Sequence, residues 1–347
     1  EGKVYITTES GNNVIIKDQS MEVLYATGTL SNLFVDKKID LQLGYEIVNN
    51  KGFSLVQEAD NKVIPIRKTL ENYDFFVSSE IKATEKFSIR PGIRASAQSK
   101  FKDQQASSLA LRYLLEKGIE IRGSYGNSFR TPSFEELYSK QIFDGHFFAG
   151  NENLIPETST SYEMSFKKNS FLASDLQINT TFSGSFLNIK NRIDMALVRF
   201  NTDTGNPEYE YINISKYKMW NFSTTNQFKK ENWTFNIGAA IIGISQKIEN
   251  QVFASNEKYL YSFNLNSSVS YVVPKWNTTF STYYKFNGKS QQFVEGASEY
   301  VISTVDSSNW LDASIRKTFF KDKFETTIGA RNLLNITSIN QSRTSEG

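Results

Sequence analysis

Apolar and polar residues alternate with a period of two along most of this chain. The clearest run begins at Lys38, where every second residue up to Ile47 is apolar and those between are charged, polar or glycine. Such a period places alternate side chains on opposite faces of a β-strand. The pattern therefore predicts a strand with one face out of water, and its apolar members are Ile39, Leu41, Leu43, Tyr45 and Ile47.

Similar runs recur and predict an all-β chain of roughly thirteen strands. Weaker apolar runs at 4–8 and 14–16 come first, and a long loop is expected at 49–69. Pro91 lacks the N–H of a strand ladder, so it predicts an edge strand or a bulge there. A turn is expected at 168–170. The clear runs lie at 73–81, 87–95, 109–115, 119–125, 162–166, 176–186, 220–228, 233–241, 263–273, 276–286, 311–315 and 324–328.

The lengths of the connections favour a membrane barrel over a soluble β-protein. Short turns at 83–86, 116–118, 274–275 and 321–323 join strand pairs whose other ends carry longer segments. Outer-membrane barrels have this asymmetry, with aromatic residues gathered near the strand ends. Many runs reach about ten residues, enough for a tilted strand to cross a bilayer. Aromatics at such ends are Phe87, Trp233, Trp276 and Trp310.

Composition narrows the function classes. Lys and Arg total 39 against 37 Asp and Glu, and no basic stripe is visible, which argues against nucleic-acid binding. Cysteine is absent, so disulfides and thiolate metal sites are excluded. No apolar run approaches the ~18 residues of a membrane helix. The mean hydropathy of −0.43 still fits a barrel, whose lumen is polar.

The sequence carries few features of an enzyme, and we expect no enzymatic activity. A single histidine makes the HExxH zinc motif impossible. Gly288-Lys289-Ser290 resembles the end of a phosphate-binding loop, but Tyr283 stands where the first glycine belongs. No pair of carboxylates is spaced for acid–base work.

The longest turn-rich interruption lies at 129–158 and carries two short boxes. The first is Phe129-Arg130-Thr131-Pro132; the second is Asn151-Glu152-Asn153-Leu154, followed by Ile155-Pro156-Glu157. Between them stands the only histidine, His146, among three aromatic residues, Phe143, Phe147 and Phe148.

These boxes resemble those of the TonB-dependent outer-membrane receptors. In that family a Phe-Arg-Ala-Pro box precedes an Asn-Pro-Asn-Leu box and a Ser-Tyr-Glu strand start, so Thr131 and Glu152 depart from the commonest residues. The order and spacing fit the family from about residue 38 to 335. Further matches are Glu135-Glu136-Leu137-Tyr138, Ser161-Tyr162-Glu163, Ile89-Arg90-Pro91-Gly92, Phe186-Leu187-Asn188-Ile189-Lys190-Asn191 and Gly329-Ala330-Arg331-Asn332-Leu333-Leu334-Asn335.

The resemblance implies an antiparallel transmembrane barrel of about 22 strands whose lumen holds an N-terminal plug. No plug and no energy-coupling box is visible in 1–347, so we expect one partial barrel domain, the later part of the barrel, with a long extracellular loop at 129–158. It also implies an active-transport receptor in the outer membrane of a Gram-negative bacterium, energised through the TonB complex. Its partners would be outer-membrane lipid and a small iron-containing ligand, taken directly or through a surface lipoprotein. No intrinsic cofactor is expected.

The family also implies roles for individual residues. In its haem-transporting members a histidine between the boxes ligates haem iron, which makes His146 a candidate ligand with Tyr138 or a plug residue as the second. Phe143, Phe147 and Phe148 would pack on the porphyrin. A loop histidine without a special role is the alternative, with a ferric siderophore as the second ligand candidate and cobalamin as the third. Arg130 and Glu157 are interpreted as structural.

Two other interpretations stay open. The chain could be a soluble or surface β-protein that binds a partner or glycan through 129–158, or a passive pore. Charged residues on the predicted lumen face could form a ligand path, but mutual pairing is the simpler interpretation. They are Asp40, Glu46, Glu80, Arg90, Arg94, Arg112, Glu120 and Arg122.

Overall fold

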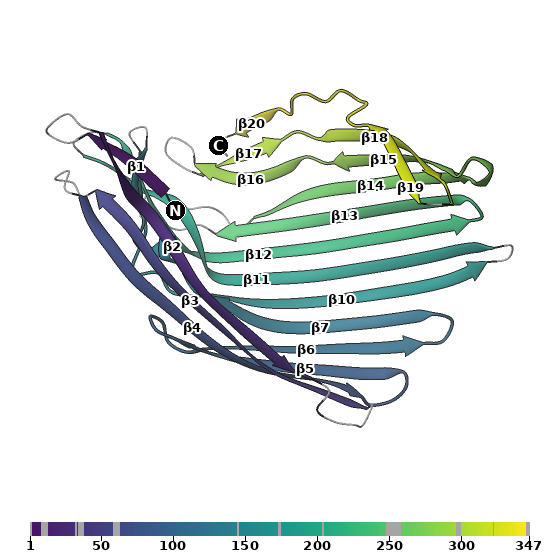
Figure 1. Cartoon of the computed structure of the whole chain (residues 1–347), viewed down its shortest axis with the longest axis horizontal. Helices are drawn as coiled ribbons and strands as arrows, with labels where there is room; N and C mark the ends of the chain where they lie inside the picture. Colours follow the sequence, from purple (N-terminus) through teal and green to yellow (C-terminus); the bar gives the residue numbers. More distant parts are fainter. Residues whose placement is uncertain are drawn as a thin grey trace.

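One curved antiparallel sheet makes up most of the molecule (Figure 1). The computed structural model describes residues 2–7, 13–31, 33, 38–57, 63–143, 146–172, 175–202, 205–247, 258–295, 300–321 and 323–344. The predicted all-β antiparallel barrel wall is confirmed, and in the described part it is open, with β1 and β19 at its two edges. None of the described helices is both long and apolar enough to span a membrane.

The wall strands pair successively along the chain, each with the wall strand before it and the one after it, apart from the two edge strands. They are β1 (Gly2–Thr7), β2 (Asn13–Leu30), β3 (Ile39–Gln57), β4 (Val63–Lys82), β5 (Phe87–Gln98), β6 (Gln104–Leu115), β7 (Ile119–Arg130), β10 (Glu157–Leu172), β11 (Leu176–Phe200), β12 (Pro207–Lys230), β13 (Trp233–Lys247), β14 (Tyr259–Val273), β15 (Thr278–Asn287), β18 (Ser308–Phe319) and β19 (Phe324–Ala330).

The remaining elements lie outside this wall order. A small sheet consists of β16 (Ser290–Glu295), β17 (Tyr300–Val305) and β20 (Gln341–Thr344). A 3-10 turn, η1 (Pro274–Trp276), joins β14 to β15. The segment between β7 and β10 contains α1 (Phe134–Tyr138), β8 (Lys140–Phe143) and β9 (His146–Ala149).

Two sequence predictions about connections are wrong. The expected loop at 49–69 is mostly strand, because β3 runs to Gln57 and β4 starts at Val63. The expected turn at 168–170 is strand as well, since β10 continues to Leu172. In the first stretch, every second residue of β3 is buried, but two of these residues, Gly52 and Ser54, are small or polar. In the second stretch, Lys168 and Asn169 are both exposed. The apolar alternation therefore fades in both although the backbone ladder continues.

Pro91 lies inside the wall, so the prediction of an edge strand or bulge is wrong. On one side it pairs with Leu109 of β6 in an unshifted register. On the other side the β4–β5 pairs pass from Ser78 with Gly92 to Ile81 with Ile89, again without a shift. The missing N–H of proline is thus accommodated by a local gap in one ladder, without an extra residue.

The two faces of the wall have opposite chemistry. Its outer side chains are large and apolar, and Phe75, Met164 and Phe222 are 66%, 63% and 55% exposed. An exposed apolar band of this kind is the face that a barrel presents to lipid.

The charges of the inner face pair with each other, as predicted. Nitrogen–oxygen distances are 2.7 Å for Arg90–Glu80, 3.4 Å for Arg94–Glu46, and 2.9 and 2.6 Å for Arg112 and Arg122 on Glu120. The wall charges on the described strands are therefore largely neutralised by their neighbours. They are weak candidates for a ligand path.

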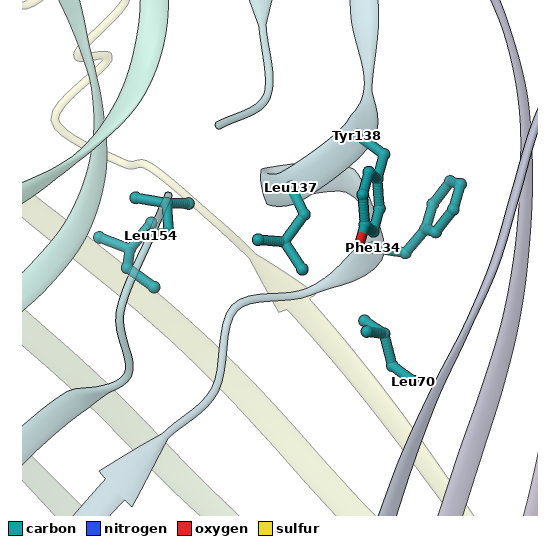
Figure 2. Packing of buried hydrophobic residues seen from close by; sticks show 6 residues of the cluster. Leu70, Phe134, Leu137, Tyr138 and Leu154 are labelled. Carbon is teal, nitrogen blue, oxygen red and sulfur yellow. The ribbon is translucent and has the colours of Figure 1, made fainter. Parts of the chain in front are cut away.

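Buried side chains gather at the mouth, around α1. Figure 2 shows Phe134, Leu137 and Tyr138 of α1 lying between Leu70 of β4 and Leu154. Ile193 of β11 completes the cluster, and Ile66, Phe101 and Tyr211 pack against it. The core therefore joins the loop to two distant parts of the wall.

A close approach fixes how α1 docks. A Cβ atom at Gly52 of β3 would lie 2.1 Å from Cδ2 of Phe134, so only glycine leaves room for the ring.

We expect Gly52→Val to displace Phe134 and weaken loop docking by about 1–3 kcal/mol, the usual cost of overpacking. Limited proteolysis of the 131–156 segment should then accelerate. Gly123→Ala is the control, because no heavy atom lies within 4 Å of its added Cβ; equal cleavage of both variants would contradict this packing.

Candidate ligand site at the barrel mouth

The mouth loop, residues 131–156, connects two strands that are already neighbours in the wall. β7 and β10 pair directly, from Glu157 with Arg130 onward. The loop thus leaves the wall and returns to it between two adjacent strands. It begins with a capping box, in which the Ser133 hydroxyl accepts from the Glu136 N–H and the Glu136 carboxylate accepts from the Ser133 N–H. This pair satisfies free N–H groups at the start of α1.

Arg130 ties both ends of the loop together. Its guanidinium donates to both carboxylate oxygens of Glu136 at 2.9 Å and to Glu157 Oε1 at 2.7 Å. Glu157 Oε1 also accepts from the backbone N–H of Ile193 at 2.7 Å. These four groups join the first box, α1, the start of β10 and β11 in one charge-assisted network.

The second box anchors the far end of the loop to β12. Asn151 Nδ2 donates to the Tyr211 carbonyl at 3.0 Å, and Asn151 Oδ1 accepts from the Asn153 N–H at 2.8 Å. The Asn213 side chain accepts from the Ile155 N–H at 3.0 Å and donates to its carbonyl at 2.9 Å. Leu154 lies in the buried cluster, so these box residues are committed to packing and backbone contacts.

The loop reaches across the mouth in two directions. Phe134 and Leu137 of α1 pack toward β3 and β4, whereas β8 and β9 form a hairpin whose second strand pairs in parallel with β12. In the wall, β7 and β10 stand between these two contact regions. The loop therefore links both flanks of its own anchor strands on the inner side of the wall.

His146 lies in an aromatic stack at the hairpin. Its ring centroid is 6.3 Å from Phe148 and 6.1 Å from Tyr209, and Phe148 and Tyr209 are 5.2 Å apart, all close to parallel. Tyr209 shares its strand face with Tyr211, which packs on the α1 cluster. The stack is therefore on the inner side. Phe147 alternates to the opposite face, and the Phe143 side chain lies outside the described part of the chain.

Tyr138 lies between two lysines at the other end of the loop. Lys100 donates to its hydroxyl at 2.9 Å, and the ammonium groups of Lys100 and Lys68 lie 4.8 and 5.7 Å from its ring centroid. Lys100 also approaches Glu152 at 3.8 Å, while the Lys68 side chain is exposed. Positive charge over an aromatic face is a stabilising arrangement and leaves a cationic surface beside the loop.

The structure places His146 and Tyr138 in separate groups. Tyr138 ends α1, beside Gly150, and His146 lies at the hairpin tip, about 13 Å further along β9 at strand spacing. Tyr138 is bonded to Lys100, whereas His146 stacks on Phe148 and Tyr209. Haem ligation by His146 and Tyr138 stays a prediction.

Comparisons with known proteins agree with this architecture. The family described as "TonB dependent receptor-like, beta-barrel" matches residues 6–333. The chain belongs to this family. Its solved structural relatives share the fold at low sequence identity, and the chain spans about half of their length.

Three solved structures illustrate the likeness. The siderophore receptor PirA from Pseudomonas aeruginosa matches with a TM-score of 0.71 at 16% identity, over 93% of this chain and 56% of that one. The ferric enterobactin receptor PfeA from the same organism, a Q482A mutant in complex with enterobactin, matches with 0.70 at 14%, over 94% and 50%. The outer-membrane transporter YddB from Escherichia coli matches with 0.66 at 12%, over 92% and 51%.

Some residues of the mouth escaped the sequence analysis. The α1 helix could have been found, since Ser133-Phe134-Glu135-Glu136 is a capping-box pattern. Lys68, Lys100 and Tyr209 carry no local motif. They join the loop only because distant strands fold around it.

Docking of the mouth loop should weaken at acidic pH. Desolvation raises the pKa of the Glu136 carboxyl, but hydrogen bonds from Arg130 and Ser133 outweigh it and hold that pKa below its usual value. A lowered folded pKa stabilises the docked loop above the unfolded pKa, and this contribution is lost as pH falls through the folded value. We expect proteolysis of 131–156 to rise at acidic pH in the native protein. Glu136→Gln should show faster cleavage at pH 7 and a flatter acid response; an unchanged acid limb would contradict the assignment.

Proposed function

We propose that this protein is an outer-membrane uptake receptor that captures a ferric chelate at its mouth loop and is energised through the TonB complex. Family membership over residues 6–333 supports the transport class. The ligand class rests on one observation, that stacked aromatic rings and lysines from several strands gather around the mouth loop. Several of its structural relatives are named as siderophore receptors.

An anionic, ring-bearing ferric chelate fits this chemistry best. Lys68 and Lys100 supply positive charge, and the rings of Phe148, Tyr209 and His146 offer flat apolar surface. Ferric catecholates carry both a negative charge and aromatic rings. Ionic hydrogen bonds and stacking would therefore act on the same ligand.

Removing the lysine charges tests the ligand class. In the intact receptor, Lys68→Gln with Lys100→Gln should weaken binding of a ferric catecholate complex by about tenfold or more, because each charged hydrogen bond contributes about 1.5–3 kcal/mol. Quenching of protein fluorescence during titration measures this affinity. The matched control is Lys102→Gln, because Lys102 is exposed and lies, like Lys100, in the connection between β5 and β6. Equal affinity in the double variant and the control would refute the catecholate assignment.

Haem is the second candidate, because His146 is the only histidine and lies on the inner side. A neutral imidazole is a good iron ligand. If haem is the cargo, adding haemin to the intact receptor should give a Soret shift that His146→Ala abolishes and Tyr138→Phe leaves in place. Identical spectra for wild type and His146→Ala would exclude haem as the ligand bound through His146.

Energised uptake separates a receptor from a passive pore. Cells that carry the receptor should accumulate labelled ferric chelate only with a working TonB complex. Uptake that persists without TonB would favour the passive pore.

A further inference from the structure

A buried carboxylate, Asp74, lies on the inner face of β4. The residue is 7% exposed, and its Oδ1 atom accepts no hydrogen bond from the described part of the chain. Its side chain points to the inner face, because the adjacent Phe75 is on the lipid-facing side. Burying an ionised carboxylate without a counter-charge is strongly unfavourable. A positive group is therefore expected beside Asp74.

The charged side chains next to Asp74 do not neutralise it. Across the strands Asp74 pairs with Glu46 of β3, which is a second carboxylate, and with Ser96 of β5. Arg94, two residues before Ser96, forms its ion pair with Glu46 at 3.4 Å. Asp74, Glu46 and Arg94 together thus carry one net negative charge.

A second buried oxygen lies close to Asp74. Gln98 Nε2 donates to the Ser96 hydroxyl at 3.2 Å, and Ser96 is directly opposite Asp74, which places their Cβ atoms about 5 Å apart. Within the described ranges, Gln98 Oε1 is, like Asp74 Oδ1, a buried acceptor to which no donor is bound. Ser96 is itself 3% exposed. Three oxygen-bearing side chains therefore gather at a buried point where acceptors outnumber donors.

A cavity of about 150 Å³ opens beside this group, toward the mouth loop. It is lined by Asn72 and Gln98 of the wall and by Ser133 of the loop, among others. This volume holds a few water molecules, each of which takes about 30 Å³ in the liquid. Because the Asp74 side chain is already covered by its own chain, the positive group that fits beside it is small.

We propose that Asp74, Ser96 and Gln98 bind a calcium ion, with water from the cavity as the remaining ligands. Carboxylate, hydroxyl and amide oxygens are the ligands of hard cations. Calcium takes about 6–8 of them in flexible geometry, whereas magnesium demands a near-ideal octahedron and loses water reluctantly. With Glu46 adjacent, two carboxylates favour a divalent over a monovalent ion.

The ligand set indicates a weak calcium site. In the part of the chain that the structure describes, no three acidic, histidine or cysteine side chains gather into a metal cluster. One free carboxylate with neutral oxygens fits the affinity of extracellular calcium modules, with a Kd of about 0.1–1 mM.

The ion would join β4 to β5 beneath the docked mouth loop. Four residues before Asp74 on β4, Leu70 packs under α1. Two residues after Gln98, Lys100 donates to the Tyr138 hydroxyl at 2.9 Å. Both contacts hold the loop, so calcium should stabilise its docking as well as the two strands.

Calcium binding by the purified intact receptor tests the site. Equilibrium dialysis with radioactive calcium should show that Asp74→Asn, which keeps the shape and removes the charge, binds about tenfold more weakly or worse. Even changes outside the first ligand shell of a metal cost about 10–100-fold. Gln98→Met, which removes one oxygen at similar length, should also weaken binding. The matched control is Asp103→Asn, because Asp103 is exposed in the β5–β6 connection; it should bind as wild type does.

Thermal unfolding gives a second readout. With a chelator present, Asp74→Asn should unfold at the same temperature as wild type or higher, because the variant removes a buried charge. Added calcium chloride should raise the Tm of wild type and of Asp103→Asn, and leave that of Asp74→Asn unchanged. Calcium should also slow proteolysis of 131–156 in wild type.

Three results would overturn the proposal. The first is a wild type that does not respond to calcium, which would assign the position to water or to a proton on Asp74. The second is an equal calcium response in Asp74→Asn and wild type. The third is a response of the same size to magnesium chloride or sodium chloride. If Asp74→Asn does not fold, as judged by heat-modifiable migration on a gel, wild type and Gln98→Met still decide the matter.

Discussion

The structure depends on one constraint, that every backbone N–H and C=O within a membrane must find a partner inside the protein. The long antiparallel ladders of the wall meet it strand by strand. Pro91 shows how strict the arrangement is, because the residue without an N–H is accommodated by a local gap and the register on either side is kept. A one-residue slip would exchange the lipid-facing and water-facing sets along the whole strand.

Beyond the membrane the same ladders serve a different purpose. β11 and β12 remain paired far past their apolar rows, and β12 then offers its edge to β9 of the mouth loop. Arg130, Glu136 and Glu157 close the base of the loop, and the buried cluster around Leu137 holds its middle. The mouth is therefore a packed and hydrogen-bonded structure, on which the aromatic stack and the lysines hold defined positions.

Charge is used differently on the two faces of the wall. Inside, Glu80, Arg90, Glu120 and their partners neutralise each other along neighbouring strands. Exposed positive charge remains at the mouth, at Lys68, and on the outer face of β11, at Lys190. These two lysines therefore lie on opposite faces of the wall.

Consecutive residues were enough to predict the class of fold, the two faces of the wall strands and the family, because both the period of two and the local boxes are patterns within short stretches of the chain. The sequence also marked where the mouth loop lies. It failed at 49–69, because the face of β3 that the structure buries there carries Gly52 and Ser54 as well as Val56, so the apolar alternation is lost although β3 and β4 continue. Folding alone brings Lys68 and Lys100 to Tyr138 and stacks His146 on Tyr209. It also places Gly123 and Gly184 on either side of Met164 in the wall. These contacts join residues far apart in the chain, and their positions are set by strand register and loop packing.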